Sequence, residues 1–261
     1  MQQAIFSTIT DNKPVKAIGA YRWMRYAAAA AVILLIGSTV WFISGRPRRM
    51  VVASMPGQIE KIALPDGSTV WLNDNTEIAY YSDFTRHRSI ELKKGEAFFE
   101  VKKDAAHPFT VQSNEVQTTV KGTSFSVKMI DRTGDIKVSV VTGKVLVHNQ
   151  QDTLGVLVPR QRLRFTHQSN AAAIDSVQAG EANAWMQGES FLQNASLNEV
   201  IQWLHDHFNV KVNNKRLNYT GEYYLQVKRD ISLQEIIKIL NLLGSKDKVQ
   251  FILNNQTVII Q

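Results

Sequence analysis

The 261-residue chain contains no cysteine. This excludes disulfides, a thiolate nucleophile and cysteine-based zinc or iron–sulfur sites, so every folded part must be held by its own packed core. Hydrophobic residues make up 44% of the chain, which is enough material for such a core. The length allows two modest domains in addition to a membrane segment.

Recognisable catalytic motifs are also missing. Gly122-Thr123-Ser124 and Gly143-Lys144 precede no predicted helix and lack the spacing of a phosphate loop, and no Gly-x-Ser-x-Gly turn is present. His205 and His207 are the only two histidines close together, and on a helix their side chains point to different faces, so they cannot chelate one metal ion. We therefore predict no metal site and no cofactor site.

Two groups of residues offer weaker hints of chemistry. Glu96 and Glu100 lie four residues apart on a predicted strand, where a structural role outweighs acid–base catalysis. Aromatic residues in strands are more often core than part of a sugar-binding surface. The aromatics in question are Trp71, Tyr80, Tyr81, Phe98, Trp185 and Trp203. We predict no catalytic residue and no enzymatic activity.

An excess of positive charge is present only near the N-terminus. The net charge is +7, but seven basic residues and one acidic residue lie in the first 50 positions. The remainder holds 23 basic and 22 acidic residues, so the charge pattern of a nucleic-acid-binding domain is absent there. We expect no direct contact with nucleic acid.

One long uncharged run, Ala27 to Ile43, is the strongest feature of the N-terminal part. Aromatic residues and arginines flank it on both sides, and its length approaches that of a bilayer core. It predicts a single transmembrane helix over residues 26–44. A buried helix of a soluble protein is disfavoured by the arginines at both ends. A cleaved signal peptide is disfavoured because no small-x-small site follows Phe42.

This anchor divides the chain. Residues 1–25 are expected to form a short cytoplasmic tail, and residues 45–58 a linker on the other side of an inner membrane. The C-terminal domains are then expected to be periplasmic. The basic flanks are nearly symmetrical, so this orientation follows from the shortness of the N-terminal tail.

Residues 59–166 show short β-branched and aromatic runs about every ten residues, separated by Gly, Asn, Asp or Pro. This pattern is typical of an all-β domain, and no helical period interrupts it. We predict an all-β domain that is solenoid-like or a twisted sandwich, with a barrel also compatible with the pattern. Residues 167–184 are polar and rich in Ala, Ser and Asn, which predicts a second linker.

Residues 185–261 contain an internal repeat. Phe191-Leu192-Gln193 precedes a helical pattern beginning at Ser196, and Tyr224-Leu225-Gln226 precedes another beginning at Ser232. Both helices open with Ser-x-x-Glu, the sequence of a capping box. A strand is expected after each helix. The repeat predicts a small α+β domain of duplicated strand–helix–strand units.

Five motifs in order resemble those of the FecR-type sigma-factor regulators. They run from Leu64 to Asn73, Gly95 to Val101, Pro108 to Val111, Gly122 to Val127 and Gly143 to Val145. Residues 185–261 resemble the secretin/TonB-like short module that ends Bacteroidetes members of that family. Together the resemblance covers about four fifths of the chain.

The resemblance implies a single-pass inner-membrane anti-sigma factor in cell-surface signalling, for example in iron or polysaccharide uptake. Its implied partners are an extracytoplasmic-function sigma factor, the signalling domain of an outer-membrane TonB-dependent transporter, and site proteases. Edge strands of the α+β domain are expected to serve in partner docking. The candidate partner-binding residues are Tyr223, Tyr224, Leu225, Gln226 and Val227.

The chain departs from the family pattern in two places. Only about 25 residues precede the anchor, where the family usually carries a longer helical sigma-binding region, so the cytoplasmic region looks truncated. Pro159-Arg160-Gln161 stands where Pro-Gly-Gln is usual. The alternative function is therefore a membrane-anchored periplasmic module that binds protein or glycan without sigma contact.

Overall fold

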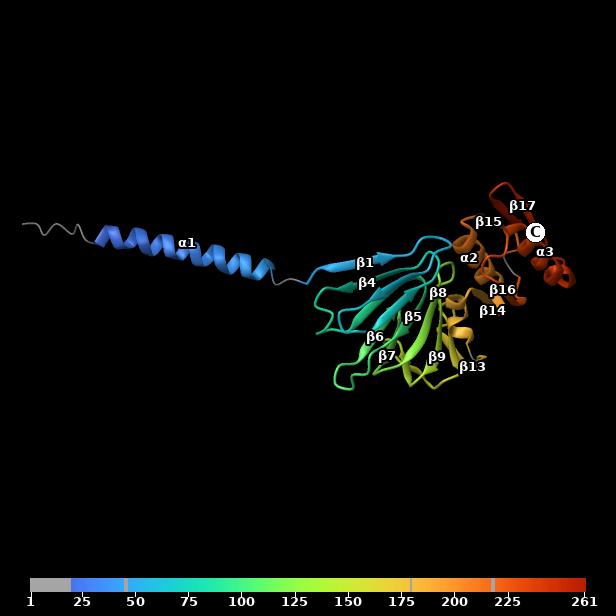
Figure 1. The fold of residues 1–261 in the computed structure, drawn as a ribbon, viewed down its shortest axis with the longest axis horizontal. Helices are drawn as coiled ribbons and strands as arrows, with labels where there is room; N and C mark the ends of the chain where they lie inside the picture. Colours follow the sequence, from blue (N-terminus) through green and yellow to red (C-terminus); the bar gives the residue numbers. More distant parts are fainter. Residues whose placement is uncertain (1–19, 45–46, 179, 217–218) are drawn as a thin grey trace, which may run out of the picture. The chain divides into compact units, whose positions relative to one another are not determined.

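The structure is a computed structural model that describes residues 20–44, 47–178, 180–216 and 219–261. The chain forms two compact units, Met1–Pro47 and Arg48–Gln261 (Figure 1). Within the first unit, the expected cytoplasmic tail of residues 1–25 lies outside the described residues as far as residue 19. Residues 20–25 are already helical.

The helix expected over residues 26–44 is present as α1 (Ala20–Ser44) and begins six residues earlier than predicted. Its first turns therefore include the charged residues Arg22 and Arg25 of the predicted flank. Across the described ranges, no helix combines the length and the hydrophobicity that crossing a membrane requires.

The second unit begins with a mainly β region, the β-domain, made of thirteen strands in one continuous sheet. They are β1 (Arg49–Ala53), β2 (Glu60–Ala63), β3 (Thr69–Leu72), β4 (Glu77–Tyr81), β5 (Ser89–Glu100), β6 (Phe109–Ser113), β7 (Val116–Val120), β8 (Ser124–Ile130), β9 (Asp135–Thr142), β10 (Val145–His148), β11 (Thr153–Leu157), β12 (Gln161–Thr166) and β13 (Ala171–Ser176).

Strand β5 organises this sheet. Its first half pairs with β4 and β6, and its second half with β3 and β8. The change occurs at Gly95, which has φ +83° and lies against Thr76. The runs Ser89 to Lys93 and Ala97 to Val101 predict two separate strands here. One twelve-residue strand forms because glycine can take the backbone conformation that the bend requires.

The sheet follows the order β11-β10-β7-β6-β5-β8-β9-β12-β13 and nearly closes on itself. Gly155 of β11 lies close to Ile174 of β13 and Leu163 of β12. The predicted all-β domain is confirmed, and its architecture is barrel-like rather than a solenoid or an open sandwich. Phenylalanines fill the interior, with Phe99 and Phe125 stacked at 5.1 Å between ring centroids.

Two segments expected as linkers contain strands. Strand β1 lies within residues 45–58 and pairs with β4, and β13 lies within residues 167–184 and pairs with β12. Ala171, Ala172 and Ala173 favour strands weakly, so pairing with β12 rather than local propensity forms β13. A 3₁₀ helix, η1 (Glu181–Gln187), follows it.

The C-terminal module comprises β14 (Glu189–Ser196), α2 (Leu197–Phe208), β15 (Lys211–Asn214), β16 (Glu222–Lys228), α3 (Leu233–Gly244), η2 (Ser245–Asp247), β17 (Phe251–Asn254) and β18 (Thr257–Ile260). Strands β14 and β16 pair in one sheet, and β15, β18 and β17 form another. The predicted small α+β region is confirmed, with the element order strand–helix–strand occurring twice, and the module has a hydrophobic core separate from that of the β-domain.

Candidate functional site

The predicted partner-binding residues, Tyr223 to Val227, form most of β16. Their side chains alternate between the two faces of the strand. Tyr223 and Leu225 are buried in the core of the module, whereas Tyr224 and Gln226 are exposed. Only two of the five predicted residues are therefore exposed to a partner, because the side-chain period of a strand is two.

The exposed side of β16 is built by a few local contacts. The ring of Tyr224 packs edge-on against Phe191 of β14 at 6.0 Å between centroids. The Tyr224 hydroxyl accepts a hydrogen bond from Gln178 Nε2 at 3.3 Å. Gln226 Nε2 donates to Glu189 Oε2 at 2.8 Å. The result is an exposed aromatic and amide surface on the two-stranded sheet.

The backbone of β16 also has an open edge. Among the described residues, β16 pairs only with β14, and the N–H of Arg229 donates to the C=O of Gly188 at 2.8 Å. In an antiparallel pair this register turns the backbone groups of Tyr224 and Gln226 away from β14. An added strand could pair with these groups.

The outer edge of β17 is less available. The carboxamide of Asn241 on α3 donates to the C=O of Phe251 at 2.9 Å and accepts from its N–H at 2.7 Å. This side chain occupies the edge as a neighbouring strand would. Covered edges resist further pairing, so β16 is a better site for strand addition than β17.

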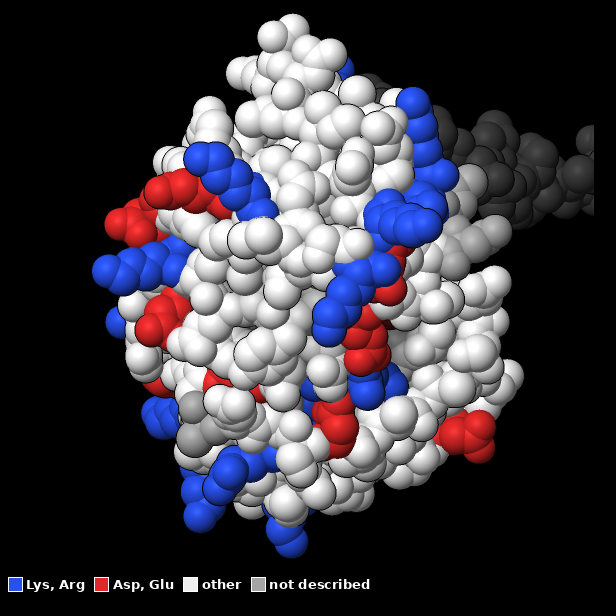
Figure 2. Space-filling view, turned by 90° about the vertical axis from the view of Figure 1, so that its right-hand side faces the viewer, with Lys and Arg blue, Asp and Glu red and all other residues white. Residues whose placement is uncertain are grey.

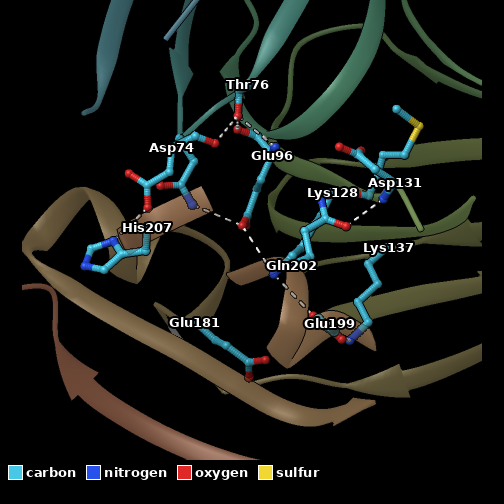
Figure 3. Close-up of polar contacts among 12 residues, drawn as sticks. Asp74, Thr76, Glu96, Lys128, Asp131, Lys137, Glu181, Glu199, Gln202 and His207 are labelled. Atoms are coloured by element: carbon cyan, nitrogen blue, oxygen red, sulfur yellow. Dashed lines mark hydrogen bonds and ion pairs between the residues drawn. The ribbon is translucent and has the colours of Figure 1, made fainter. Parts of the chain in front are cut away.

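A second group of functional side chains lies where the C-terminal module contacts the β-domain (Figure 3). We call this contact the joint. It consists of polar and charged residues rather than a shared hydrophobic core. The residues are Asp74, Asn75, Lys128, Asp131, Lys137, Glu199, Gln202, Asp206, His207 and Arg229.

Glu199, the third residue of α2, is the most buried carboxylate of the joint. Its oxygens lie 3.2 Å from Lys128 Nζ on β8 and 2.5 Å from Lys137 Nζ on β9. Burial alone would raise the pKa of Glu199, but the two lysines hold it below the ordinary value. Glu199 is therefore an anion clamped between two cations.

The next contact joins Asp74 of the β3–β4 turn to the module. The Asp74 carboxylate pairs with the guanidinium of Arg229 and lies 2.9 Å from His207 Nδ1. Arg229 Nη1 also donates to Asn73 Oδ1 at 2.9 Å. Burial lowers the pKa of Arg229 to about 10, so the side chain remains charged near neutrality.

Gln202 provides the third contact, in the middle of α2. Its Oε1 accepts from the N–H of Asp131 at 2.6 Å, and its Nε2 donates to the C=O of Met129 at 3.2 Å. One side chain thus satisfies two backbone groups at the end of β8. Asn75 Nδ2 donates to Asp206 Oδ1 at 2.7 Å on the next turn of the helix.

The joint encloses a cavity of about 80 Å³. Its lining includes Lys137, Arg162, Glu199 and Trp185, and Trp185 Nε1 is buried without a hydrogen-bond partner among the described residues. A polar cavity of this size suits ordered water rather than a metabolite. The joint is therefore organised to hold two parts of the chain together.

The residues considered for catalysis or metal binding have structural contacts. His205 Nδ1 lies 3.1 Å from the C=O of Val210, and the described residues hold no group of three metal-ligating side chains. Glu96 accepts from Asn73 at 3.2 Å, whereas Glu100 is exposed.

The aromatic residues do not form one surface. Phe98 and Trp185 are buried, as the core interpretation predicts, whereas Tyr81 is exposed. Trp71 packs against Phe98 and under the ammonium of Lys61. A shared sugar-binding platform is therefore not assembled from these side chains.

Sequence reasoning missed the joint. Lys128 and Lys137 are directly opposite each other on β8 and β9, and like charges in that position destabilise a sheet unless neutralised. Their opposition depends on strand pairing and is not visible in the sequence. In the sequence, only Glu199 could have pointed to the joint, and the Ser-x-x-Glu pattern predicts a local helix cap for it instead.

Comparison with known proteins agrees with this architecture. Residues 50–146 match the protein family described as FecR protein. Two crystal structures of a putative anti-sigma factor from Parabacteroides distasonis are similar. The first is 25% identical with a TM-score of 0.73, covering 81% of this chain and 98% of that chain. The second is 24% identical with a TM-score of 0.74, covering 82% and 98%.

None of the curated proteins matches the chain significantly. The family match covers most of the β-domain, and the structural similarity extends over the C-terminal module as well. The β-domain therefore matches the FecR protein family over residues 50–146, and the β-domain together with the C-terminal module is similar to a putative anti-sigma factor.

Proposed function

We propose that this protein is an anti-sigma factor that relays a signal from the signalling domain of an outer-membrane TonB-dependent transporter to an extracytoplasmic-function sigma factor. Its FecR-type β-domain and its similarity to a protein described as an anti-sigma factor support this role. The open edge of β16 is the observation that carries the transporter part of the proposal.

We also propose that the uncharged run Ala27 to Ile43 anchors the chain in the inner membrane by a single pass, with a cytoplasmic N-terminus and periplasmic C-terminal domains. Support comes from the uncharged run Ala27 to Ile43 and the arginines beyond it. The side chains of Ile33, Leu34 and Leu35 are 68%, 73% and 66% exposed, so this helix presents apolar surface that needs a partner or a lipid phase.

The docking surface proposed for the transporter domain is the outer side of β16. The end of the molecule that carries the module shows a broad uncharged area with charged side chains gathered toward its sides (Figure 2). An incoming strand would pair with the outward backbone groups of Tyr224 and Gln226 and contact their side chains.

The binding test is titration of the full chain with an isolated transporter signalling domain. Gln226→Pro removes an outward N–H without removing a hydrogen bond to β14, and Tyr224→Ala removes the exposed ring. Each variant should weaken binding about tenfold or more, as loss of an interface tyrosine often does. Tyr81→Ala is the matched control, because Tyr81 is 51% exposed and Tyr224 50%.

The regulatory part is tested with a reporter for the sigma regulon in cells that carry either this chain or a deletion. Signal-dependent control restored by the chain supports the anti-sigma role. Expression equal to that of the deletion strain would instead favour the alternative, an anchored module that binds protein or glycan without sigma contact. Transporter binding without reporter control would separate the two halves of the proposal.

A further inference from the structure

The duplicated unit places two equivalent helix starts in one chain. Each has a glutamate at its third helical position, and the two glutamates make different contacts. At α3, Ser232 Oγ accepts from the N–H of Glu235, and the Glu235 carboxylate accepts from the N–H of Ser232 at 3.2 Å. This is a complete capping box. Glu235 is exposed and acts only within its own helix.

At α2 only half of the same box forms. Ser196 Oγ accepts from the N–H of Glu199 at 3.3 Å, as in α3. The Glu199 carboxylate turns instead to Lys128 and Lys137 of the β-domain. Glu199 thus occupies the same position in α2 that Glu235 occupies in α3. The side chain of Glu235 caps its own helix, whereas that of Glu199 contacts the β-domain.

The two lysines need a carboxylate at this place. They are cross-strand neighbours on β8 and β9, and their side chains are only 18% and 12% exposed. Two buried cations in direct opposition repel each other, so neutralisation by Glu199 favours the docked position of the module. Glu96 lies farther away, at 3.8 Å from Lys128 Nζ.

The remainder of the joint is suited to opening. The hydrophobic cores of the β-domain and of the module are separate, and the hydrogen bonds and ion pairs of the joint run between them. Separating such surfaces exposes groups that water can solvate, whereas no continuous hydrophobic core is broken. Polar contacts between domains are the kind that permit relative motion.

From these observations we propose that Glu199 is a latch with two positions. In the docked position its carboxylate binds Lys128 and Lys137 and holds the module against the β-domain. In the undocked position it turns back to the N–H of Ser196 and completes the capping box, as Glu235 does at α3. The helix cap offsets part of the lost ion pairing, so the joint opens reversibly. The latch does not depend on the binding role proposed for β16.

The opening of the joint can be measured as a distance in the full chain. The protein has no cysteine, so Gln151→Cys on the β-domain and Gln256→Cys on the module introduce the only two sites for spin labels. Glu199→Gln weakens the attraction to the lysines but can still cap the helix. It should broaden the distance distribution toward longer distances. Glu235→Gln, the matched control, should leave the distribution unchanged.

The second position is tested by amide hydrogen exchange at Ser196. In the Lys128→Met/Lys137→Met variant the freed Glu199 should cap the helix and slow exchange of the Ser196 amide about tenfold, the effect of one ordinary hydrogen bond. Adding Glu199→Ala should abolish this slowing. The Ser232 amide serves as an internal reference in every sample.

Two results would overturn the latch. An unchanged distance distribution in Glu199→Gln would show that Glu199 does not hold the joint. An open joint in the lysine variant with no slowing at Ser196 would show a simple ion pair without a second position. Unaltered exchange in the β-domain strands distinguishes these results from general unfolding.

Discussion

Arg160 illustrates how one residue departs from the FecR-type motif that the sequence otherwise resembles. It occupies the place of the usual glycine in Pro159-Arg160-Gln161 and has φ +68°, in the left-handed region. Its N–H still donates to the C=O of Val140 at 3.0 Å, so the turn keeps the conformation that glycine favours. Arginine in place of glycine at position 160 therefore adds backbone strain to the turn without changing its backbone conformation.

This strain predicts that Arg160→Gly is stabilising. Relief of a left-handed non-glycine residue should raise the free energy of unfolding by about 1 kcal/mol, measured by urea denaturation. Arg132→Gly is the control, because Arg132 is an exposed turn residue without positive φ and glycine there should be neutral or destabilising. Equal effects of both substitutions would contradict the assignment of strain to Arg160.

A buried ion pair fixes the turn that follows β2. The side chains of Arg88 and Asp66 are 3% and 7% exposed, and Arg88 Nη2 lies 2.7 Å from Asp66 Oδ2. The guanidinium also donates to the backbone C=O of Lys102 and of His107. Asp66→Ala leaves that cation buried without its partner and should cost about 3–5 kcal/mol of stability. Glu91→Ala removes the exposed pair with Arg49 and should cost at most about 1 kcal/mol. Thermal unfolding of both variants tests the difference.

Asp206 gives the joint a dependence on pH. Burial raises the pKa of Asp206; the hydrogen bond from Asn75 offsets part of this increase, and the nearby Asp131 carboxylate adds to it. The folded protein therefore keeps a proton that the unfolded chain has already released, so stability falls as the pH rises from 3.8 through the folded pKa.

Asp206→Asn removes this titration. The free energy of unfolding of the variant, relative to the parent protein, should therefore be higher at neutral pH than at pH values below 3.8. Urea denaturation across the pH range measures the difference. A difference that stays constant with pH would show that the Asp206 carboxyl titrates alike in the folded and unfolded states.

At the scale of elements, β5 depends on Gly95 to pass from one part of the sheet to the other. A Cβ at this position would overlap Thr76 Oγ1 and lie 2.8 Å from Thr76 Cα. Gly95→Ala should therefore add a backbone clash to the cost of positive φ, for a total of about 3 kcal/mol. Denaturant unfolding provides the measurement.

Gly188→Ala separates the two costs. Gly188 has the same φ of +83° as Gly95, but a Cβ added to it would have no atom within 4 Å. This substitution should cost only about 1 kcal/mol. If both variants lose the same stability, close contact with Thr76 is not what requires glycine at position 95.

Most individual elements could be predicted from local patterns. Glu77 to Tyr81 matches β4, and the two Ser-x-x-Glu sequences mark the starts of α2 and α3. These signals arise within a few neighbouring residues. Strand β13 could not be predicted in this way, because its alanines form a strand only through pairing with β12.

At the scale of the whole second unit, two hydrophobic cores meet through polar contacts. Arg229→Ala removes the guanidinium from buried Asp74 and should cost about 3 kcal/mol. Calorimetry should then resolve two unfolding transitions, with the module unfolding first. Lys228→Ala, a change at the exposed neighbouring residue, should leave the profile of the parent protein. One transition merely shifted in temperature would mean that the two cores remain coupled.

The amino-acid sequence by itself determined the kinds of elements and their order: an apolar N-terminal helix, a series of short strands and a duplicated strand–helix–strand unit. Alternation, helical period and capping residues act between near neighbours, so they can be recognised without a structure. The FecR motifs are likewise local, and the family match over residues 50–146 agrees with them.

Only the tertiary structure decided the near closure of the sheet and the destination of the Glu199 carboxylate. Lys137 and Glu199 are 62 residues apart in the chain, and Asp74 and Arg229 are 155 residues apart. Contacts of this kind depend on how whole elements pack. The Glu199 carboxylate could accept from the N–H of Ser196 or pair with two lysines, and packing brings the charged lysines within its reach. Glu235 therefore completes a local cap in α3, whereas Glu199, at the equivalent position of α2, joins two parts of the molecule.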